Sequence, residues 1–91
     1  MALPSEMLVN VLSPASTLLS GFKAKHVKVP GALGYLGIMP GHAPFMSGLV
    51  SGEMTIESGS GESKKFSITG GFVEVIGDQV TVLADSAKLL A

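Results

Sequence analysis

A chain of 91 residues has room for one domain with a single core, and not for a second domain that would form a deep cleft. It contains no cysteine and no arginine, which excludes disulfides and thiolate zinc sites and argues against nucleic-acid binding or a strong phosphate clamp. With a net charge of −1 and only 14% charged residues, against about 25% in typical proteins, much of its surface is neutral, which favours a partner that covers part of it.

The N-terminal segment lacks the pattern of a secretory signal, because it has no early positive charge and Glu6 interrupts its apolar residues. The chain also has no run approaching the roughly 18 apolar residues needed to span a bilayer. We therefore expect no direct membrane insertion, and any membrane association to come through a partner protein.

Twelve glycines and five prolines divide the chain into short runs rich in Val, Ile, Phe and Thr, which is typical of an all-β sandwich or barrel. Residues 7–12 alternate in polarity and predict a first strand, which Pro14 ends because proline cannot donate to a strand ladder. Residues 17–19 predict a short pairing segment. Residues 22–29 predict one strand, in which a β-bulge near Lys25 explains a shift in the apolar phase.

Residues 30–44, PGALGYLGIMPGHAP, are dense in glycine and proline and predict a turn, a short strand at 35–38 and a second tight turn. The spacing of Gly31, Gly34 and Gly37 does not match the G-x-G-x-x-G loop of dinucleotide sites, and no long helix or P-loop motif follows. We interpret these glycines as turn positions and expect no bound cofactor.

The second half of the chain predicts four more strands, which lie at 53–57, 65–69, 72–76 and 79–84. Residues 58–63 read as a flexible hairpin connection, and Gly77-Asp78 predicts a type II′ turn. Residues 86–91 are the only helix-compatible segment, and they are too few to form a stable helix alone.

No catalytic or metal-binding arrangement is recognisable. His42 has only His26 as a second histidine, without the spacing of a metal site, and no nucleophile or orienting acid accompanies it. Two interpretations stay open for His42: a turn histidine bonded to backbone, or a contact residue for a partner. The carboxylates that we expect to be solvated, rather than paired for acid–base chemistry, are Glu53, Glu57 and Glu62. We therefore expect a protein that is not an enzyme.

Two further features have open interpretations. The basic stretch of Lys23, Lys25 and Lys28 is either a solvated face or a docking surface for an acidic partner. Tyr35, the lone tyrosine, lies between glycines and is either an interface residue or a lid folded over the core.

Residues 29–44 closely resemble one family of sequences, and four further segments agree with it in order and spacing. These segments read VLSP at 11–14, LSGF at 19–22, TGGFVEV at 69–75 and VTVLAD at 80–85. Together they resemble the epsilon subunits of F-type ATP synthases, which are called delta in mitochondria. The resemblance spans nearly the whole chain, and its specificity comes from the combination of PGHAP, GGFVEV and VTVLAD.

The resemblance implies the family's N-terminal domain, a ten-stranded β-sandwich of two five-stranded sheets, over residues 1–86, with residues 87–91 as a C-terminal stub. In that family the domain lies at the foot of the central stalk, binds the gamma subunit and rests on the ring of c subunits. It turns as part of the rotor, which couples ion translocation to ATP synthesis, and it has no catalytic site. The resemblance also implies a peripheral location at the cytoplasmic face of a bacterial inner membrane.

Contact residues follow from the resemblance by position. The residues that match the family's contacts with gamma are Ser13, His42 and Ser47. The loop that matches its contact with the c-ring is formed by Gly34, Tyr35, Leu36 and Gly37. The family often has a glutamate where this chain has Tyr35, so a hydrogen bond or a stacking contact is expected to replace an acidic one.

Most bacterial relatives continue into a two-helix hairpin that inhibits ATP hydrolysis and, in some of them, binds ATP. This sequence stops at Ala91. With that hairpin absent, the resemblance implies assembly and coupling without hairpin inhibition, and no ATP binding. The alternative to a rotor subunit is a free-standing regulatory or ligand-binding module on the same β-sandwich scaffold.

Overall fold

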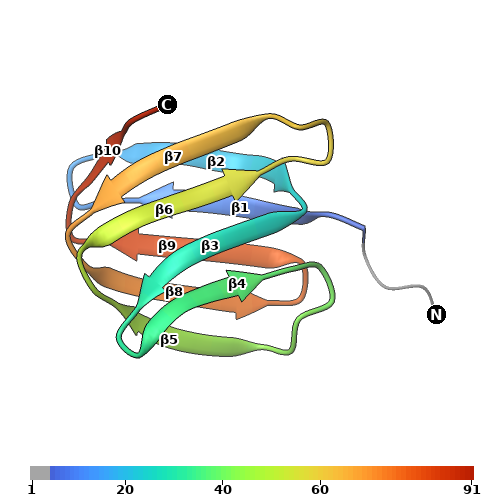
Figure 1. Ribbon diagram of the computed structural model, residues 1–91, viewed down its shortest axis with the longest axis horizontal. Coiled ribbons are helices and arrows are strands. Elements are labelled where there is room, and N and C mark those ends of the chain that lie inside the picture. The colour runs from blue at the N-terminus through green and yellow to red at the C-terminus, as the bar shows by residue number, and fades with distance from the viewer. Residues whose placement is uncertain (1–4) are drawn as a thin grey trace.

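The computed structural model describes residues 5–91, which form ten β-strands and no helix (Figure 1). The first four residues of the N-terminal segment, and of the predicted domain 1–86, lie outside the described part. The strands are β1 (Met7–Leu12), β2 (Thr17–Ala24), β3 (His26–Gly31), β4 (Gly34–Ile38), β5 (Phe45–Leu49), β6 (Gly52–Glu57), β7 (Ser63–Ile68), β8 (Gly71–Ile76), β9 (Gln79–Ala84) and β10 (Ala87–Leu89).

The strands form two layers, which Figure 1 shows one in front of the other. One layer has the order β10-β7-β6-β3-β4 and the other the order β5-β8-β9-β1-β2. The described strand pairs are antiparallel except β1 with β9, which are parallel. The prediction of a ten-stranded sandwich with five strands in each sheet is confirmed, with one difference. The two layers are continuous at one corner, where Gly31 of β3 pairs with Leu49 of β5.

The core between the layers consists of the inward-facing apolar side chains of both. Its largest fully buried members include Phe66, Met7, Ile38 and Met54. Within residues 5–91 no polar or charged side chain is buried. Burial of apolar surface is therefore the main force that holds the layers together.

The segment predicted as one strand at 22–29 is two strands. Ala24 ends β2 in one layer, and His26 begins β3 in the other. The shift in apolar phase near Lys25 therefore marks a crossover between layers, and the prediction of a single bulged strand is wrong. Because the chain changes layers there, Ala24 and Val27 can both point into the same core.

The predicted segment 17–19 is the first part of β2. Val9 of β1 pairs with Phe22 and Val11 pairs with Leu19, so β2 has one residue more than β1 over this stretch. Gly21 accommodates the irregularity with φ of +64°, and its backbone N–H donates to the Asn10 side-chain oxygen at 2.8 Å.

Residues 45–49 form β5, a strand that the local sequence pattern does not predict. The side chains of Phe45, Ser47 and Leu49 point toward the interior, while Met46 and Gly48 are exposed on the outer side. Ser47 and Gly48 are weak strand formers, so local propensity gave little signal. β5 is instead stabilised by its pairing with β8, which extends along the whole length of β5.

The helix-compatible C-terminal segment is not helical. Residues Ala87–Leu89 form β10, which pairs with β7, and the Leu90 N–H donates to the Lys65 carbonyl at 2.7 Å. A single helical turn would leave most of its backbone groups without partners, whereas the edge of β7 provides a row of them.

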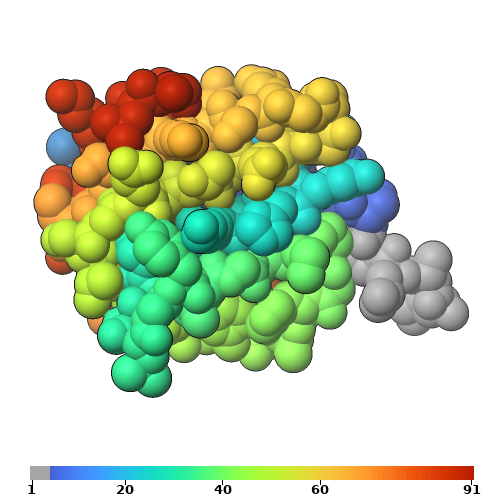
Figure 2. Space-filling model, in the orientation of Figure 1, coloured from blue at the N-terminus to red at the C-terminus, as the bar shows by residue number. Residues whose placement is uncertain are grey.

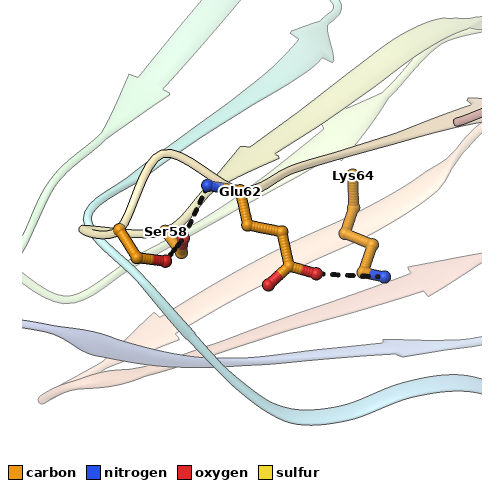
Figure 3. Close-up of polar contacts among 4 residues, drawn as sticks. Ser58, Glu62 and Lys64 are labelled. Carbon is orange, nitrogen blue, oxygen red and sulfur yellow. Dashed lines mark hydrogen bonds and ion pairs between the residues drawn. The ribbon is translucent and has the colours of Figure 1, made fainter.

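The two predicted hairpins of the second half are confirmed. Gly77 has φ of +62° and Asp78 a negative φ, as a two-residue type II′ turn between β8 and β9 requires. In the β6–β7 connection the Ser58 hydroxyl accepts from the Glu62 N–H at 3.0 Å, and Glu62 pairs with Lys64 at 3.4 Å (Figure 3). This loop is thus held together by its own side chains.

Candidate functional site

The two outer faces of the sandwich differ in polarity. The outer face of β7, β6 and β3, which Figure 2 shows, has polar and charged side chains in alternation with the core residues. His26 and Glu57 lie there as a pair, with their Nδ1 and Oε1 atoms 3.6 Å apart. Such a surface of mixed charge is well solvated and needs no covering partner.

The opposite outer face, formed by β5, β8, β9 and β1, carries a group of large apolar side chains beside the polar Asn10, Glu74, Gln79 and Thr81. Its exposed side chains include Met46, Phe72, Ile76 and Leu83, with exposed fractions of 64%, 56%, 57% and 50%. We call these four residues, with Leu12, the apolar face. Large exposed apolar side chains that gather on one sheet mark a surface for another protein.

The register of the strands makes this surface continuous. Gly48, Phe72 and Leu83 are direct partners across β5, β8 and β9, and Leu83 is the partner of Leu12 in β1. Two hollows, of about 420 and 190 Å³, lie over this row on either side of Phe72 and Leu83. A partner can therefore insert side chains into the apolar face rather than only rest on it.

Ser13 follows β1 directly and lines the larger hollow beside Leu12 and Phe72. Its hydroxyl donates to the Ser16 carbonyl at 3.3 Å, in a tight turn. The structure therefore places Ser13 at one margin of the apolar face.

Ser47 does not lie on the apolar face. It is on β5 between Met46 and Gly48, with its side chain on the inner side of the strand, half-buried. Its hydroxyl donates to the Gly48 carbonyl at 3.1 Å. Ser47 is thus next to the apolar face in the sequence of β5, but its side chain lies on the opposite side of the sheet.

His42 lies in the exposed connection between β4 and β5. Its Nδ1 is 2.8 Å from the Ala43 carbonyl oxygen, and its ring centroid is 4.8 Å from that of Phe45. Phe45 pairs with Val75, which lies toward the opposite end of β8 from Phe72. Because His42 contacts Phe45 and Ser13 lies beside Phe72, these two residues lie toward opposite ends of the apolar face. The backbone bond agrees with a turn histidine, and the exposure leaves the ring accessible to a partner.

The hairpin tip between β3 and β4 is the second exposed feature, and Figure 2 shows this turn projecting from the surface. Gly31 pairs with Gly34, which leaves Ala32 and Leu33 at the apex, and Leu33 is fully exposed. We call residues 31–37 the hairpin tip.

Tyr35 is 55% exposed, with the Lys28 ammonium 4.9 Å from its ring centroid. The interpretation of Tyr35 as a lid over the core is therefore wrong, and its role as an interface residue stays a prediction. Leu36 is turned the other way and packs against the core. Gly37 lies under the His26 ring, where an added Cβ would come within 3.2 Å of Nε2.

The predicted basic stretch does not form one face. Lys23 lies on β2, Lys25 at the crossover and Lys28 on β3, so these exposed lysines are spread over both layers. Within residues 5–91 no three His, Asp or Glu side chains gather as metal ligands, and no helix is suited to cross a membrane.

The apolar face is not among the surfaces predicted from the sequence, where its residues are strand positions. The available signal is that β8 has apolar residues of both parities, since Phe72 and Ile76 alternate with the buried Val73 and Val75. A strand that is apolar on both sides has an apolar outer surface.

Comparisons with known proteins agree with this architecture. A family model described as "ATP synthase, Delta/Epsilon chain, beta-sandwich domain" matches residues 6–89. The ATP synthase epsilon chain of Myxococcus xanthus is 44% identical over 85 residues, which cover 92% of this chain and 60% of that protein. The ATP synthase epsilon chain of Brevibacillus brevis is 39% identical over 85 residues, covering 93% of this chain and 64% of that one. The chain thus spans less than two thirds of the length of these relatives.

Two solved structures show the same fold at low sequence identity. A chain of the Euglena gracilis mitochondrial ATP synthase structure of OSCP, F1 and c-ring has a TM-score of 0.91 at 19% identity, covering 98% of this chain and 56% of that one. A chain of the Tetrahymena thermophila mitochondrial ATP synthase central stalk and c-ring has a TM-score of 0.76 at 18% identity, covering 96% and 69%. With the family model matched over 6–89 and the epsilon chains about 40% identical, the chain belongs to the ATP synthase delta/epsilon family and contains its β-sandwich domain.

Proposed function

We propose that this chain is a non-catalytic central-stalk subunit of an F-type ATP synthase, which binds gamma and the c-ring. The observation that supports this most is the difference between the two outer faces. One is polar and suited to water, while the other exposes Met46, Phe72, Ile76 and Leu83 together. A domain that turns with the rotor needs one covered face and one solvated face.

The gamma subunit is the proposed occupant of the apolar face. Ser13 at one margin and His42 toward the opposite end frame this surface, and Ser47 lies on the strand beside it. The resemblance aligns these positions with the family's gamma contacts. Ser13 and His42 support a contact that runs along the apolar face, whereas Ser47, on the inner side of β5, is adjacent to it.

The c-ring is the proposed partner of the hairpin tip. Leu33 at the apex and Tyr35 beside it offer an apolar and an aromatic contact, with Lys28 adding a positive charge. Gly34, Leu36 and Gly37 shape the tip. The tip and the apolar face are distinct surfaces, so one subunit can hold two partners at once.

In this proposal the sandwich transmits torque as a stiff body, coupling ion translocation to ATP synthesis. The hydrogen-bonded corner between Gly31 and Leu49 supports stiffness, because the layers cannot slide past one another without breaking it. The proposed location is peripheral, at the cytoplasmic face of a bacterial inner membrane, and the described domain is expected to bind no ATP. The division between 1–86 and 87–91 stays a prediction.

The proposal is tested with purified cognate gamma subunit. The wild-type chain should co-elute with gamma in gel filtration at micromolar concentration. Phe72→Asp should abolish co-elution, because a charge on the apolar face is desolvated in the complex. Ser67→Asp, on the polar face, is the matched control and should bind as wild type. A wild-type chain that stays apart from gamma contradicts the proposal and favours the free-standing module.

A further inference from the structure

Glu74 is the only charged side chain among the outward-facing residues of the described strand β8. It lies between Phe72 and Ile76 along the strand, and its cross-strand partners are Met46 on β5 and Thr81 on β9. It is half-buried, whereas Phe72 and Ile76 on either side are 56% and 57% exposed. The carboxylate is thus set into the middle of the apolar face.

No hydrogen bond or ion pair within residues 5–91 engages the Glu74 carboxylate. The two ion pairs of the described chain lie elsewhere, between His26 and Glu57 and between Glu62 and Lys64. The lysines also lie off β5, β8, β9 and β1, on the other strands or at the crossover. Any protein that covers the apolar face therefore removes Glu74 from water with no cation of this chain to compensate it.

A carboxylate in that position is tolerated in a stable complex only if the partner supplies the compensating charge, because desolvating an unpaired ion is strongly unfavourable. The hollow of about 190 Å³ over this part of the face is lined by Met46, Phe72, Glu74, Thr81 and Leu83. Met46, Phe72 and Leu83 form its apolar walls, and the Glu74 carboxylate and the Thr81 hydroxyl lie side by side in it. It therefore suits a long side chain with an apolar stem and a cationic head.

We propose that the gamma subunit inserts an arginine into this hollow and pairs it with Glu74, an inference that rests on the proposed function. The planar guanidinium offers several donors in one fork, enough for the carboxylate and the Thr81 hydroxyl together. The Met46 and Phe72 side chains pack along the stem and the face of the guanidinium. A lysine offers a single charged nitrogen and fits this pair of acceptors less well.

This pair fixes the orientation of the complex. The remainder of the apolar face is non-directional, so apolar contacts alone allow gamma to settle in several registers. One desolvated charge pair allows one register and disfavours partners that lack the cation. Glu74 is accordingly the specificity-determining residue of the interface.

The test measures the Kd of the chain for cognate gamma by titration calorimetry, with Glu74→Gln and Glu74→Lys variants. We expect Glu74→Gln to raise the Kd at least about tenfold and Glu74→Lys at least about a hundredfold, since truncating a buried charge pair has effects of this size or larger. Glu53→Gln and Glu53→Lys on the polar face are the matched controls and should leave the Kd unchanged. Circular dichroism and thermal unfolding check that each variant is folded.

The partner arginine is found by charge reversal. Each surface arginine of gamma is changed singly to Glu and titrated with Glu74→Lys, and one of these variants should restore binding. The inference is overturned, while the proposed function stands, if wild type binds gamma and both Glu74 variants bind gamma with the same Kd as wild type. It is also overturned if no charge reversal in gamma restores binding to Glu74→Lys. If wild type itself does not bind gamma, both are overturned.

Discussion

The ammonium of Lys28 lies 4.9 Å from the centre of the Tyr35 ring, on the outer surface of the hairpin tip. The cation–π contact joins a side chain of β3 to one of β4. It restricts the ring of Tyr35, which is exposed on the proposed c-ring surface.

Tyr35→Ala should weaken binding to isolated c-ring by about fivefold or more, equivalent to about 1 kcal/mol, because the exposed ring is removed. Tyr35→Phe keeps the ring and serves as the control. Surface plasmon resonance on detergent-solubilised c-ring measures both. Equal binding by all three proteins would exclude Tyr35 from the contact.

His42→Asp should weaken gamma binding without lowering stability, since the side chain is exposed and its one polar contact is with the adjacent Ala43 carbonyl. The Kd for gamma and the midpoint of thermal unfolding are measured together. Ser60→Asp, in the β6–β7 loop, is the matched control. An unchanged Kd for His42→Asp would remove this residue from the interface.

Gly71→Ala should lower the free energy of unfolding by about 2–4 kcal/mol. Gly71 has φ of +131°, and an added Cβ would clash with the Leu83 carbonyl oxygen. Gly48→Ala, where an added Cβ has open space, should be close to neutral. Urea denaturation of both variants distinguishes them, and similar losses would contradict the close approach of β8 and β9.

Phe66→Ala and Phe72→Ala remove the same side chain from different places. Phe66 is 1% exposed in the core, so its loss should reduce the free energy of unfolding by about 3–5 kcal/mol. Phe72 is 56% exposed, so its loss should change stability by less than about 0.5 kcal/mol while weakening gamma binding. A large stability loss in Phe72→Ala would mean that it supports the fold rather than the interface.

Deletion of residues 87–91 tests the boundary drawn at residue 86. Because β10 pairs with β7, we expect deletion to lower the free energy of unfolding by about 2 kcal/mol or more, at about 0.5–1.5 kcal/mol for each lost backbone hydrogen bond. Lys88→Ala, which keeps the backbone pairing, is the control. Unchanged stability after deletion would support 1–86 as the complete domain.

Most strands could be predicted from local pattern. Residues 7–12 and 79–84 alternate with a period of two and match β1 and β9 as observed. The Gly77-Asp78 turn was also predictable, because its backbone requirement is met by glycine itself. These features depend only on residues close together in the chain.

The features that were not predicted depend on distant pairing. β5 and β10 form because β8 and β7 offer them partners, which neither segment encodes alone. The apolar face depends on distant pairing only in part, because the apolar residues of both parities in β8 are visible in the sequence. Phe72 and Val73 look alike in the sequence, and the pairing of β8 with its neighbours determines which of them turns outward. Ser13 and His42 could be located by resemblance, but their relation to this face required the fold.

The parallel pairing of β1 with β9 has a consequence for how the chain acquires its structure. Leu8 pairs with Gln79 and Leu12 with Leu83, so the second edge of β1, the first strand, pairs only with β9, the ninth of ten strands. During synthesis β1 can pair with β2 early, but its other edge stays open until β9 has left the ribosome. Such long-range pairing slows folding and prolongs exposure of an unpaired strand edge. Substitutions in β9 should therefore act first on solubility during expression, before any effect on rotor assembly is seen.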